Sequence, residues 1–313
     1  MRLFVIGHKS PDLDTVVSAT MYSDFLNQIK RYPEYEIIPA IAGEPNKETQ
    51  MVYEKFNIQL PKNISTYTIN DNDKFVLVDH NELAQRADEI RNDKILEILD
   101  HHRVVVDFTT PIYITVRPLG ANASVIYREF ELEQIQVTPM YRTLVLSAII
   151  SDTQGLKSST TTHIDIDLTN KLSAQVNINL NELIYEIFKA KSDITGATPE
   201  QLTRRDCKTL DFNGNKIFIN QIETVEPEKL ISMKQELIGA LEKVKYEEKA
   251  NYGIIVITDI LNNTSSIIAT EAEIELISNS FNTSVQNNVA DIGALTSRKK
   301  DIVPRIEKFL TAK

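Results

Sequence analysis

Histidine and aspartate are concentrated in four short strings of this sequence, and a fifth string holds clustered cations. The strings are residues 7–14 (GHKSPDLD), 78–81 (VDHN), 100–102 (DHH), 151–153 (SDT) and 297–300 (SRKK). The chain has only five histidines, and four of them lie in these strings. Carboxylate and imidazole groups together suit Mn²⁺, Co²⁺ or Zn²⁺, whereas lysine and arginine suit phosphate. The pattern predicts a two-metal hydrolase that acts on a small, strongly anionic phosphate compound.

The first string supplies three candidate metal ligands, His8, Asp12 and Asp14. Asp12 and Asp14 are two positions apart, so both carboxylates point the same way if the segment is extended. An alternative remains open, in which Asp14 caps a helix that starts at Thr15 and Asp12 belongs to a turn. Both roles can coexist for Asp14.

Asp79, His101, His102 and Asp152 extend the candidate set. Asp79 and His101 each follow a run so apolar that a charged side chain must leave the core or find a partner. If their segment stays extended, adjacent His101 and His102 face opposite sides, so one can bind metal while the other faces substrate. Asp152 ends an apolar helix-like run, where a carboxylate opposes the helix dipole and calls for a cation. Taken singly, Asp79 could be a turn residue and Asp152 an exposed helix end.

Together these ligands favour a site in which two metals about 3.5–4 Å apart share a carboxylate and activate a bridging water. The absence of thiolate ligands argues against a structural zinc site. A covalent route is not supported, because there is no Gly-x-Ser-x-Gly elbow and no histidine lies near Cys207 in the sequence.

Clustered cations lie in the last third of the chain. Lys208 ends the string RRDCK at 204–208, and Arg298 and Lys299 stand in SRKK at 297–300. Taken alone, each string is typical of a solvated surface run. If two domains close on each other, these cations would neutralise phosphoryl charge in a water-poor cleft.

The elements that must position the strings alternate between strand and helix. The pattern predicts strands at 2–6, 35–41, 75–78, 95–99 and 113–116, helices at 15–30 and 46–56, and a polar helical stretch between 78 and 95. Such alternation is typical of a largely parallel α/β sheet, in which ligands bind at the carboxyl ends of strands. Because His8, Asp79 and His101 each lie at such an end, we expect them to converge at one edge of the sheet.

Four more helices, at 124–131, 141–150, 162–172 and 180–191, complete a first domain predicted at residues 1–190. Residues 191–198 contain glycine, lack amphipathic periodicity and form the predicted linker. A smaller mixed α/β domain follows at 199–313, with strands at 216–222, 253–260 and 265–269, a long helix at 227–249 and a closing helix at 304–310. The expected fold is α/β with two domains and the active site in the cleft between them.

Bulk composition limits the possible partners and location. A length of 313 residues allows two domains of ordinary size. The net charge of −10 argues against nucleic acid, whose phosphates attract basic proteins. No apolar run approaches the ~20 residues that span a bilayer, so no membrane partner is expected. Cys207 is the only cysteine, which excludes an internal disulfide and favours the cytoplasm.

In their order and spacing, the strings resemble the manganese-dependent (family II) inorganic pyrophosphatases of the DHH phosphoesterase superfamily. The resemblance extends through residues 147–153, 156–162, 258–260 and 297–304, and so covers nearly the whole chain. It implies an N-terminal DHH domain, a DHH-associated C-terminal substrate-binding domain, and hydrolysis of pyrophosphate to two orthophosphates by a metal-bridged water.

The resemblance also implies a role for each candidate residue. One metal would be held by His8, Asp12 and Asp79, and the other by Asp14, Asp79, His101 and Asp152, with Asp79 bridging. Catalytic and substrate-binding roles would fall to His102, Lys208, Arg298 and Lys299, with His102 protonating or stabilising the leaving phosphate. The implied cofactors are two Mn²⁺ or Co²⁺ ions, with Mg²⁺ accompanying the substrate, and the implied assembly is a homodimer through the N-terminal domain.

The sequence departs from the family pattern at a few positions. Ser10 stands where the family usually has Asn, Leu13 replaces Thr or Ser, and GANAS at 120–124 differs from the usual GCTAT. None of these changes removes a predicted ligand. An exopolyphosphatase or small-nucleotide phosphodiesterase of the same superfamily remains an alternative, as does a non-catalytic metal-binding protein.

Overall fold

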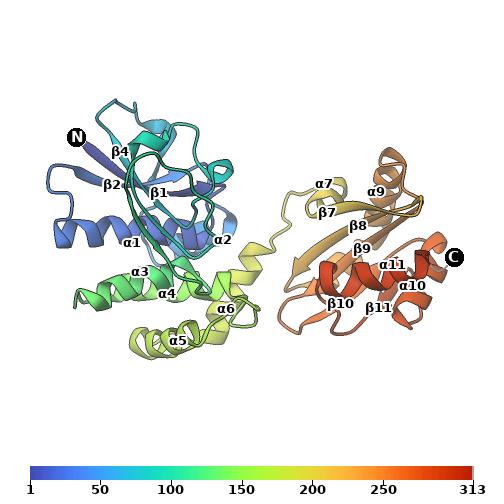
Figure 1. Cartoon of the computed structure of the whole chain (residues 1–313). Coiled ribbons are helices and arrows are strands. Elements are labelled where there is room, and N and C mark those ends of the chain that lie inside the picture. Colours follow the sequence, from blue (N-terminus) through green and yellow to red (C-terminus); the bar gives the residue numbers. More distant parts are fainter. Residues whose placement is uncertain (312–313) are drawn as a thin grey trace. The chain divides into compact units, whose positions relative to one another are not determined.

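A computed structural model describes residues 1–311 and divides them into two compact units, each built on its own β-sheet (Figure 1). The first unit comprises Met1–Lys191, and the second begins at Ser192. Among the described residues, no helix combines the length and the apolarity that crossing a membrane requires.

The first unit contains a six-stranded parallel sheet in the order β3-β2-β1-β4-β5-β6. Its strands are β1 (Arg2–Lys9), β2 (Glu36–Ala42), β3 (Lys62–Asn63), β4 (Lys74–Val78), β5 (Ile95–Asp100) and β6 (Tyr113–Val116). The strands predicted from the apolar runs are confirmed, whereas β3 is too short to produce a recognisable pattern. Because β1, β4 and β5 are neighbours, their carboxyl ends lie side by side at one edge of the sheet.

Helices cover one face of this sheet. They are α1 (Leu13–Ile29), α2 (Lys47–Lys55), α3 (Asn122–Leu132), α4 (Pro139–Asp152), α5 (His163–Val176) and α6 (Leu180–Lys191). Helix α1 packs on β1 and β2, and α3 and α4 pack against α1, an arrangement that can be followed in Figure 1. The helices predicted in this unit are confirmed, except between β4 and β5.

Irregular segments cover the opposite face of the sheet. Phe4, Phe75 and Leu77 pack there with Ala87 and Ile90 from the connection between β4 and β5. The predicted polar helix in this connection is wrong, because it contains only two single-turn 3₁₀ helices, Leu83–Gln85 and Asn92–Lys94. Two buried apolar residues three positions apart are too few to hold a helix on the sheet, since a surface helix needs a continuous apolar stripe.

The second unit contains a five-stranded mixed sheet in the order β11-β10-β9-β8-β7, in which only β8 and β9 are parallel. Its strands are β7 (Cys207–Phe212), β8 (Asn215–Thr224), β9 (Tyr252–Asp259), β10 (Thr264–Ile268) and β11 (Val289–Asp291). Its helices are α7 (Pro199–Arg204), α8 (Pro227–Ser232), α9 (Lys234–Glu247), α10 (Ile274–Phe281), the π-helical turn Arg298–Ile302, and α11 (Val303–Thr311). Helices α10 and α11 pack on one face and α7, α8 and α9 on the other. The predicted mixed α/β architecture is confirmed.

The single long helix predicted at 227–249 is wrong. The segment is divided between α8 and α9 by Met233, whose backbone leaves the helical region at φ −91° and ψ 13°. Leu230 of α8 and Leu237 and Leu241 of α9 pack in one apolar cluster. The seven-residue spacing across the break preserves the helical pattern in the sequence, which explains why the interruption was not visible there.

Candidate metal centre

The four histidine- and aspartate-rich strings meet at the carboxyl edge of the first sheet. His8 lies near the end of β1, Asp79 directly follows β4, and His101 directly follows β5. Asp12 precedes α1, and Asp152 is the last residue of α4. The predicted convergence of His8, Asp79 and His101 at one edge is confirmed, and it follows from the parallel pairing of β1, β4 and β5.

The candidate ligand atoms form three overlapping clusters, each with its atoms within 4.8 Å of one another. The clusters are His8, Asp12 and Asp79; Asp14, His101 and Asp152; and Asp79, His101 and His102. Asp79 therefore belongs to two clusters, one of which contains His8 and the other His101. The structure places all six predicted metal ligands, together with His102, in one site.

Asp79 lies at the middle of this arrangement with 1% of its surface exposed. Its Oδ2 atom is 3.5 Å from His8 Nε2, and its Oδ1 atom is 3.2 Å from His101 Nε2. Neither Asp79 Oδ1 nor His101 Nε2 has a hydrogen-bond partner among residues 1–311, although both atoms are buried. Buried polar atoms without partners are costly, and a divalent cation would satisfy both. This donor set fits Mn²⁺, which accepts carboxylate and imidazole ligands.

Backbone carbonyls orient two of the histidines. His8 Nδ1 lies 2.8 Å from the carbonyl oxygen of Lys9, and His101 Nδ1 lies 2.9 Å from that of Leu119. A carbonyl oxygen only accepts, so Nδ1 must carry the proton in each ring. When either ring is neutral, the lone pair is therefore on Nε2, the atom that faces the carboxylates.

The carboxylates are held by backbone N–H groups at two helix starts. Asp12 Oδ1 accepts from the Thr15 N–H at 3.0 Å, so Asp12 rather than Asp14 is the N-cap of α1. Asp14 accepts from Asn122 N–H at 2.5 Å and Ala123 N–H at 2.8 Å, in the first turn of α3. The positive end of the α3 dipole thus stabilises the Asp14 carboxylate and fixes its orientation.

Backbone strain accompanies the site. Asp79 has φ +60° and Ser10 has φ +57°, both in the left-handed region that non-glycine residues avoid. Asparagine tolerates this region better than serine, so Asn would suit position 10 better than Ser10 does. Strain of this kind persists where surrounding contacts hold the backbone, and it is common at functional sites.

The clustered charges shift several pKa values. Burial opposes the charge on His8, but hydrogen bonds to Asp12 and Asp79 raise its pKa to about 11. Burial likewise opposes the charge on His101, and Asp79 and Asp14 raise its pKa to about 10. Burial would raise the pKa of Asp79, but the two histidines lower it well below its ordinary value.

The pKa values of Asp14 and Asp152 shift in the opposite direction. Burial raises the pKa of Asp14 to about 8, and the negative charge of Asp79 adds to the shift. Burial also raises the pKa of Asp152 well above its ordinary value, with Asp14 as a further cause. When no metal is bound, protons on the histidines and on Asp14 and Asp152 therefore offset the negative charge of the clustered carboxylates.

His102 is half exposed and is held by Asp100. Its Nδ1 lies 2.8 Å from Asp100 Oδ1, and this hydrogen bond raises the pKa of His102. Asp100 is fully buried and also accepts from the backbone N–H groups of His101 and His102. Asp100 therefore fixes the conformation of the two adjacent histidines.

Thr15 and Glu48, near the centre, were not identified from the sequence, whereas His80 was expected to lie just outside the ligands as a supporting residue. Thr15 is buried and donates to Asp79, and buried Glu48 accepts from Ser151 beside Asp152. A Thr or a Glu inside a helical pattern carries no local signal of such long-range contacts. His80 is buried, its Nδ1 donates to the Val78 carbonyl, and burial lowers its pKa to about 4, so this ring is neutral.

The predicted cations lie in the second unit. Lys208 is exposed on β7, and Arg298 and Lys299 begin the π-helical turn. Arg298 donates to the carbonyl and carboxylate oxygens of Asp206 at 3.0 and 2.8 Å. Arg298 therefore contacts a residue two positions before Lys208, which brings the two cationic strings of this unit together.

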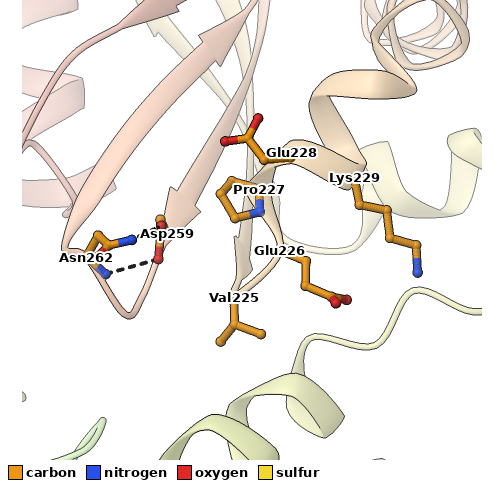
Figure 2. Close-up of a pocket in the computed structure, with 7 residues that line it drawn as sticks. All are labelled: Val225, Glu226, Pro227, Glu228, Lys229, Asp259 and Asn262. Atoms are coloured by element: carbon orange, nitrogen blue, oxygen red, sulfur yellow. Dashed lines mark hydrogen bonds between the residues drawn. The ribbon is translucent and has the colours of Figure 1, made fainter.

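A separate hollow of about 490 Å³ lies in the second unit, near the end of β9 and the start of α8 (Figure 2). It is lined by Val225, Glu226, Pro227, Glu228, Lys229, Asp259 and Asn262. Asn262 donates to Asp259 at one side of it, as Figure 2 shows. Three carboxylates against one lysine make this hollow unsuitable for a phosphate compound, so it is not a second substrate site.

Comparison with known proteins gives the same organisation. Residues 2–149 match the profile of the DHH family N-terminal domain, and residues 185–309 match the DHHA2 domain. The crystal structure of a Methanococcus jannaschii protein assigned to the family II inorganic pyrophosphatases is 33% identical, with 98% of each chain covered and a TM-score of 0.64. An exopolyphosphatase-related protein from Bacteroides fragilis is only 14% identical with a TM-score of 0.51, which shows likeness of fold alone.

Curated relatives are similar over their full length. A manganese-dependent inorganic pyrophosphatase from Methanothrix thermoacetophila is 34% identical over 309 residues, covering 98% of this chain and 97% of the relative. A Bacillus licheniformis protein named as a probable manganese-dependent inorganic pyrophosphatase is 31% identical over 310 residues, with 99% of each covered. Identity at this level over the whole length shows common descent, and the chain belongs to the family of manganese-dependent inorganic pyrophosphatases.

Proposed function

We propose that this protein hydrolyses inorganic pyrophosphate to two orthophosphates with two Mn²⁺ ions. The observation that carries the proposal is the convergence of six candidate ligands in three overlapping clusters, two of which contain Asp79 and two of which contain His101. The family to which the chain belongs supports the choice of substrate. Co²⁺ is proposed as a second activating ion and Mg²⁺ as the ion that accompanies pyrophosphate, because both accept oxygen ligands.

Separate sets of residues would bind the two ions and the substrate. His8, Asp12 and Asp79 would hold one ion, and Asp14, Asp79, His101 and Asp152 the other. When bound, two such ions stabilise charge on phosphate oxygens and lower the pKa of water. Lys208, Arg298 and Lys299 would bind substrate phosphate by charge-assisted hydrogen bonds.

His102 is the proposed proton donor to the leaving phosphate. Its Nδ1 is engaged by Asp100, so its other ring nitrogen remains for a substrate oxygen. The raised pKa keeps more of the ring protonated at neutral pH, which a general acid requires. Asp100 thereby acts on the reaction only through His102.

Phosphate release by metal-stripped protein tests this assignment. Pyrophosphate would be supplied with Mn²⁺, Co²⁺ or Mg²⁺ separately, and polyphosphate and a cyclic dinucleotide would be run in parallel. We expect fast release from pyrophosphate with Mn²⁺ or Co²⁺. Cleavage of another substrate without action on pyrophosphate would overturn the proposed substrate while retaining a two-metal site.

The Asp79→Ala variant tests the central ligand. We expect loss of turnover with an unchanged circular dichroism spectrum, because Asp79 contributes to two of the ligand clusters. Asp167→Ala is the matched control, since Asp167 is an exposed aspartate on α5. Near-normal turnover of Asp79→Ala would eliminate its bridging role.

We further propose that two copies of the chain associate through β6. This strand is at the edge of the first sheet, and Tyr113 and Ile114 are 64% and 43% exposed on it. An exposed edge strand with apolar side chains readily pairs with another strand. Ile114→Lys should therefore yield a monomer in analytical ultracentrifugation, whereas Leu132→Lys, at an exposed leucine on α3, should leave a dimer. A monomeric wild-type protein would refute this assembly.

The single cysteine, Cys207, supports a reducing compartment, and we propose the cytoplasm as the location.

A further inference from the structure

Thr15 connects two of the proposed ligands of one metal ion. Its backbone N–H donates to Asp12 Oδ1 at 3.0 Å, and its hydroxyl donates to Asp79 Oδ2 at 2.6 Å. Asp12 and Asp79 are 67 positions apart in the chain, and no solvent competes for the hydroxyl because Thr15 is completely buried. One residue in the first turn of α1 thus fixes two carboxylates, one at the start of α1 and the other at the end of β4.

These hydrogen bonds determine which oxygens remain for a cation. With Asp12 Oδ1 occupied, Asp12 Oδ2 is the oxygen that faces His8 Nε2, at 3.5 Å. With the Thr15 hydroxyl on Asp79 Oδ2, Asp79 Oδ1 is left facing His101 Nε2 without a hydrogen bond inside residues 1–311. A carboxylate that could rotate freely would not leave a chosen oxygen buried and unpaired.

The packing around Thr15 is also specific. A Cβ atom on Gly7 would lie 2.2 Å from Thr15 Cγ2, so β1 can approach α1 here only because residue 7 has no side chain. The Thr15 methyl group is therefore held against β1 while its hydroxyl points to Asp79. This contact restrains the rotamer of Thr15 and, through it, the strained Asp79, whose φ is +60°.

We propose that Thr15 is a positioning residue of the metal centre, which sets Asp79 and Asp12 in the orientation that binds Mn²⁺. The proposal rests on the metal site described under the proposed function. Hydrogen bonds to metal-binding carboxylates keep them in a binding geometry before the metal arrives, and their loss costs affinity even when every ligand is present.

Thr15→Val and Thr15→Ser form a matched pair for the test. Valine keeps the shape of threonine and removes the hydroxyl, whereas serine keeps the hydroxyl and removes the methyl group. Mn²⁺ would be titrated into metal-stripped protein, and free Mn²⁺ would be measured by its electron paramagnetic resonance signal. We expect Thr15→Val to weaken Mn²⁺ binding by ~10–100-fold and Thr15→Ser to stay near wild type.

The thermal stability of the metal-free variants separates positioning from a merely structural role. A structural role would lower the melting temperature of metal-free Thr15→Val but leave its Mn²⁺ affinity unchanged. Mn²⁺ affinity equal to that of the wild type would overturn the inference. Failure of the wild-type protein itself to bind Mn²⁺ would instead refute the proposed metal site, so the two failures are distinguishable.

Gly7→Ala provides an independent test that leaves the hydroxyl in place. The added methyl group should displace Thr15 and weaken Mn²⁺ binding. In the double variant Gly7→Ala with Thr15→Ser, the atom that clashes is gone, and the next approaches are 3.1 Å to Cβ and 3.3 Å to Oγ1. We expect the double variant to bind Mn²⁺ more tightly than Gly7→Ala alone, a coupling that independent sites do not show. If the two substitutions instead changed Mn²⁺ affinity additively, the proposed action of Gly7 on the metal site through Thr15 would be overturned.

Discussion

Mn²⁺ binding should expel protons from the metal centre, because protonated histidines occupy it when no metal is present. His8 and His101 lie among carboxylates that raise their pKa values to about 11 and about 10. Both rings must become neutral before Nε2 can bind a cation. At pH 7.5 the protein should therefore release one proton for each histidine that binds metal.

The magnitude follows from these pKa values. A histidine with a pKa of about 10 is almost fully protonated at pH 7.5, whereas one with the ordinary pKa of about 6.5 carries only about 0.1 proton. Two ordinary histidines would thus release about 0.2 proton in total, and the two histidines of this site should release about two. Asp14, with a pKa of about 8, should add roughly 0.8 proton when it binds a cation.

Isothermal titration calorimetry measures this release directly. Mn²⁺ would be titrated into metal-stripped protein at pH 7.5 in buffers of different ionisation enthalpy, and the slope of heat against that enthalpy gives the number of protons. His101→Gln should release about one proton fewer. His163→Gln should match the wild type, since His163 is an exposed residue of α5. A wild-type release of about 0.2 proton would refute the account of the charged histidines.

Three other predictions concern stability and substrate binding. The metal-free protein should lose thermal stability as pH rises from 7 towards 10. The charged rings of His8 and His101, whose pKa values are raised in the folded state, stabilise the fold fully only below about pH 6.5, and this stabilisation is lost as the rings deprotonate. Scanning calorimetry that found stability rising over this range would contradict the prediction. Ser10→Asn should raise the free energy of unfolding in urea by up to about 1 kcal/mol, since asparagine tolerates a φ of +57° better than serine does. A lower free energy of unfolding would exclude backbone strain at this position. Asp206→Ala should raise KM for pyrophosphate by up to about fivefold, because the exposed ion pair between Asp206 and Arg298 contributes at most about 1 kcal/mol. An unchanged KM in steady-state kinetics would show that Asp206 does not orient Arg298 for substrate binding.

The sequence was sufficient to predict that the candidate ligands converge, because three of them lie at the ends of recognisable strands. His8, Asp79 and His101 lie at the ends of apolar strand runs, and parallel strands bring such ends to one edge. The second unit was harder, because β7, which carries Lys208, alternates only partly and is exposed at the sheet edge. An edge strand with one solvated face leaves little hydrophobic pattern to read.

The residues that tune the centre could not have been predicted, since their contacts depend on distances across the folded unit. Glu48 belongs to α2, yet its carboxylate accepts from Ser151 at 2.9 Å and lies 3.8 Å from the ammonium group of Lys191. Thr15 reaches Asp79 in the same way, across 64 residues of chain. Hydroxyl and carboxylate groups inside helical patterns are usually solvated, so the sequence alone favours a surface position for both.

The electrostatics explain why these supporting residues matter. Asp14, Asp79 and Asp152 are close enough that each raises the cost of charging another, and burial adds to that cost. Carboxylates in such a group would rotate apart unless donors held them, as Thr15 holds Asp79 and the start of α3 holds Asp14. These donors hold the carboxylates close together, which favours a divalent cation at this position. We therefore expect metal affinity in this protein to depend on uncharged neighbours as well as on the ligands themselves.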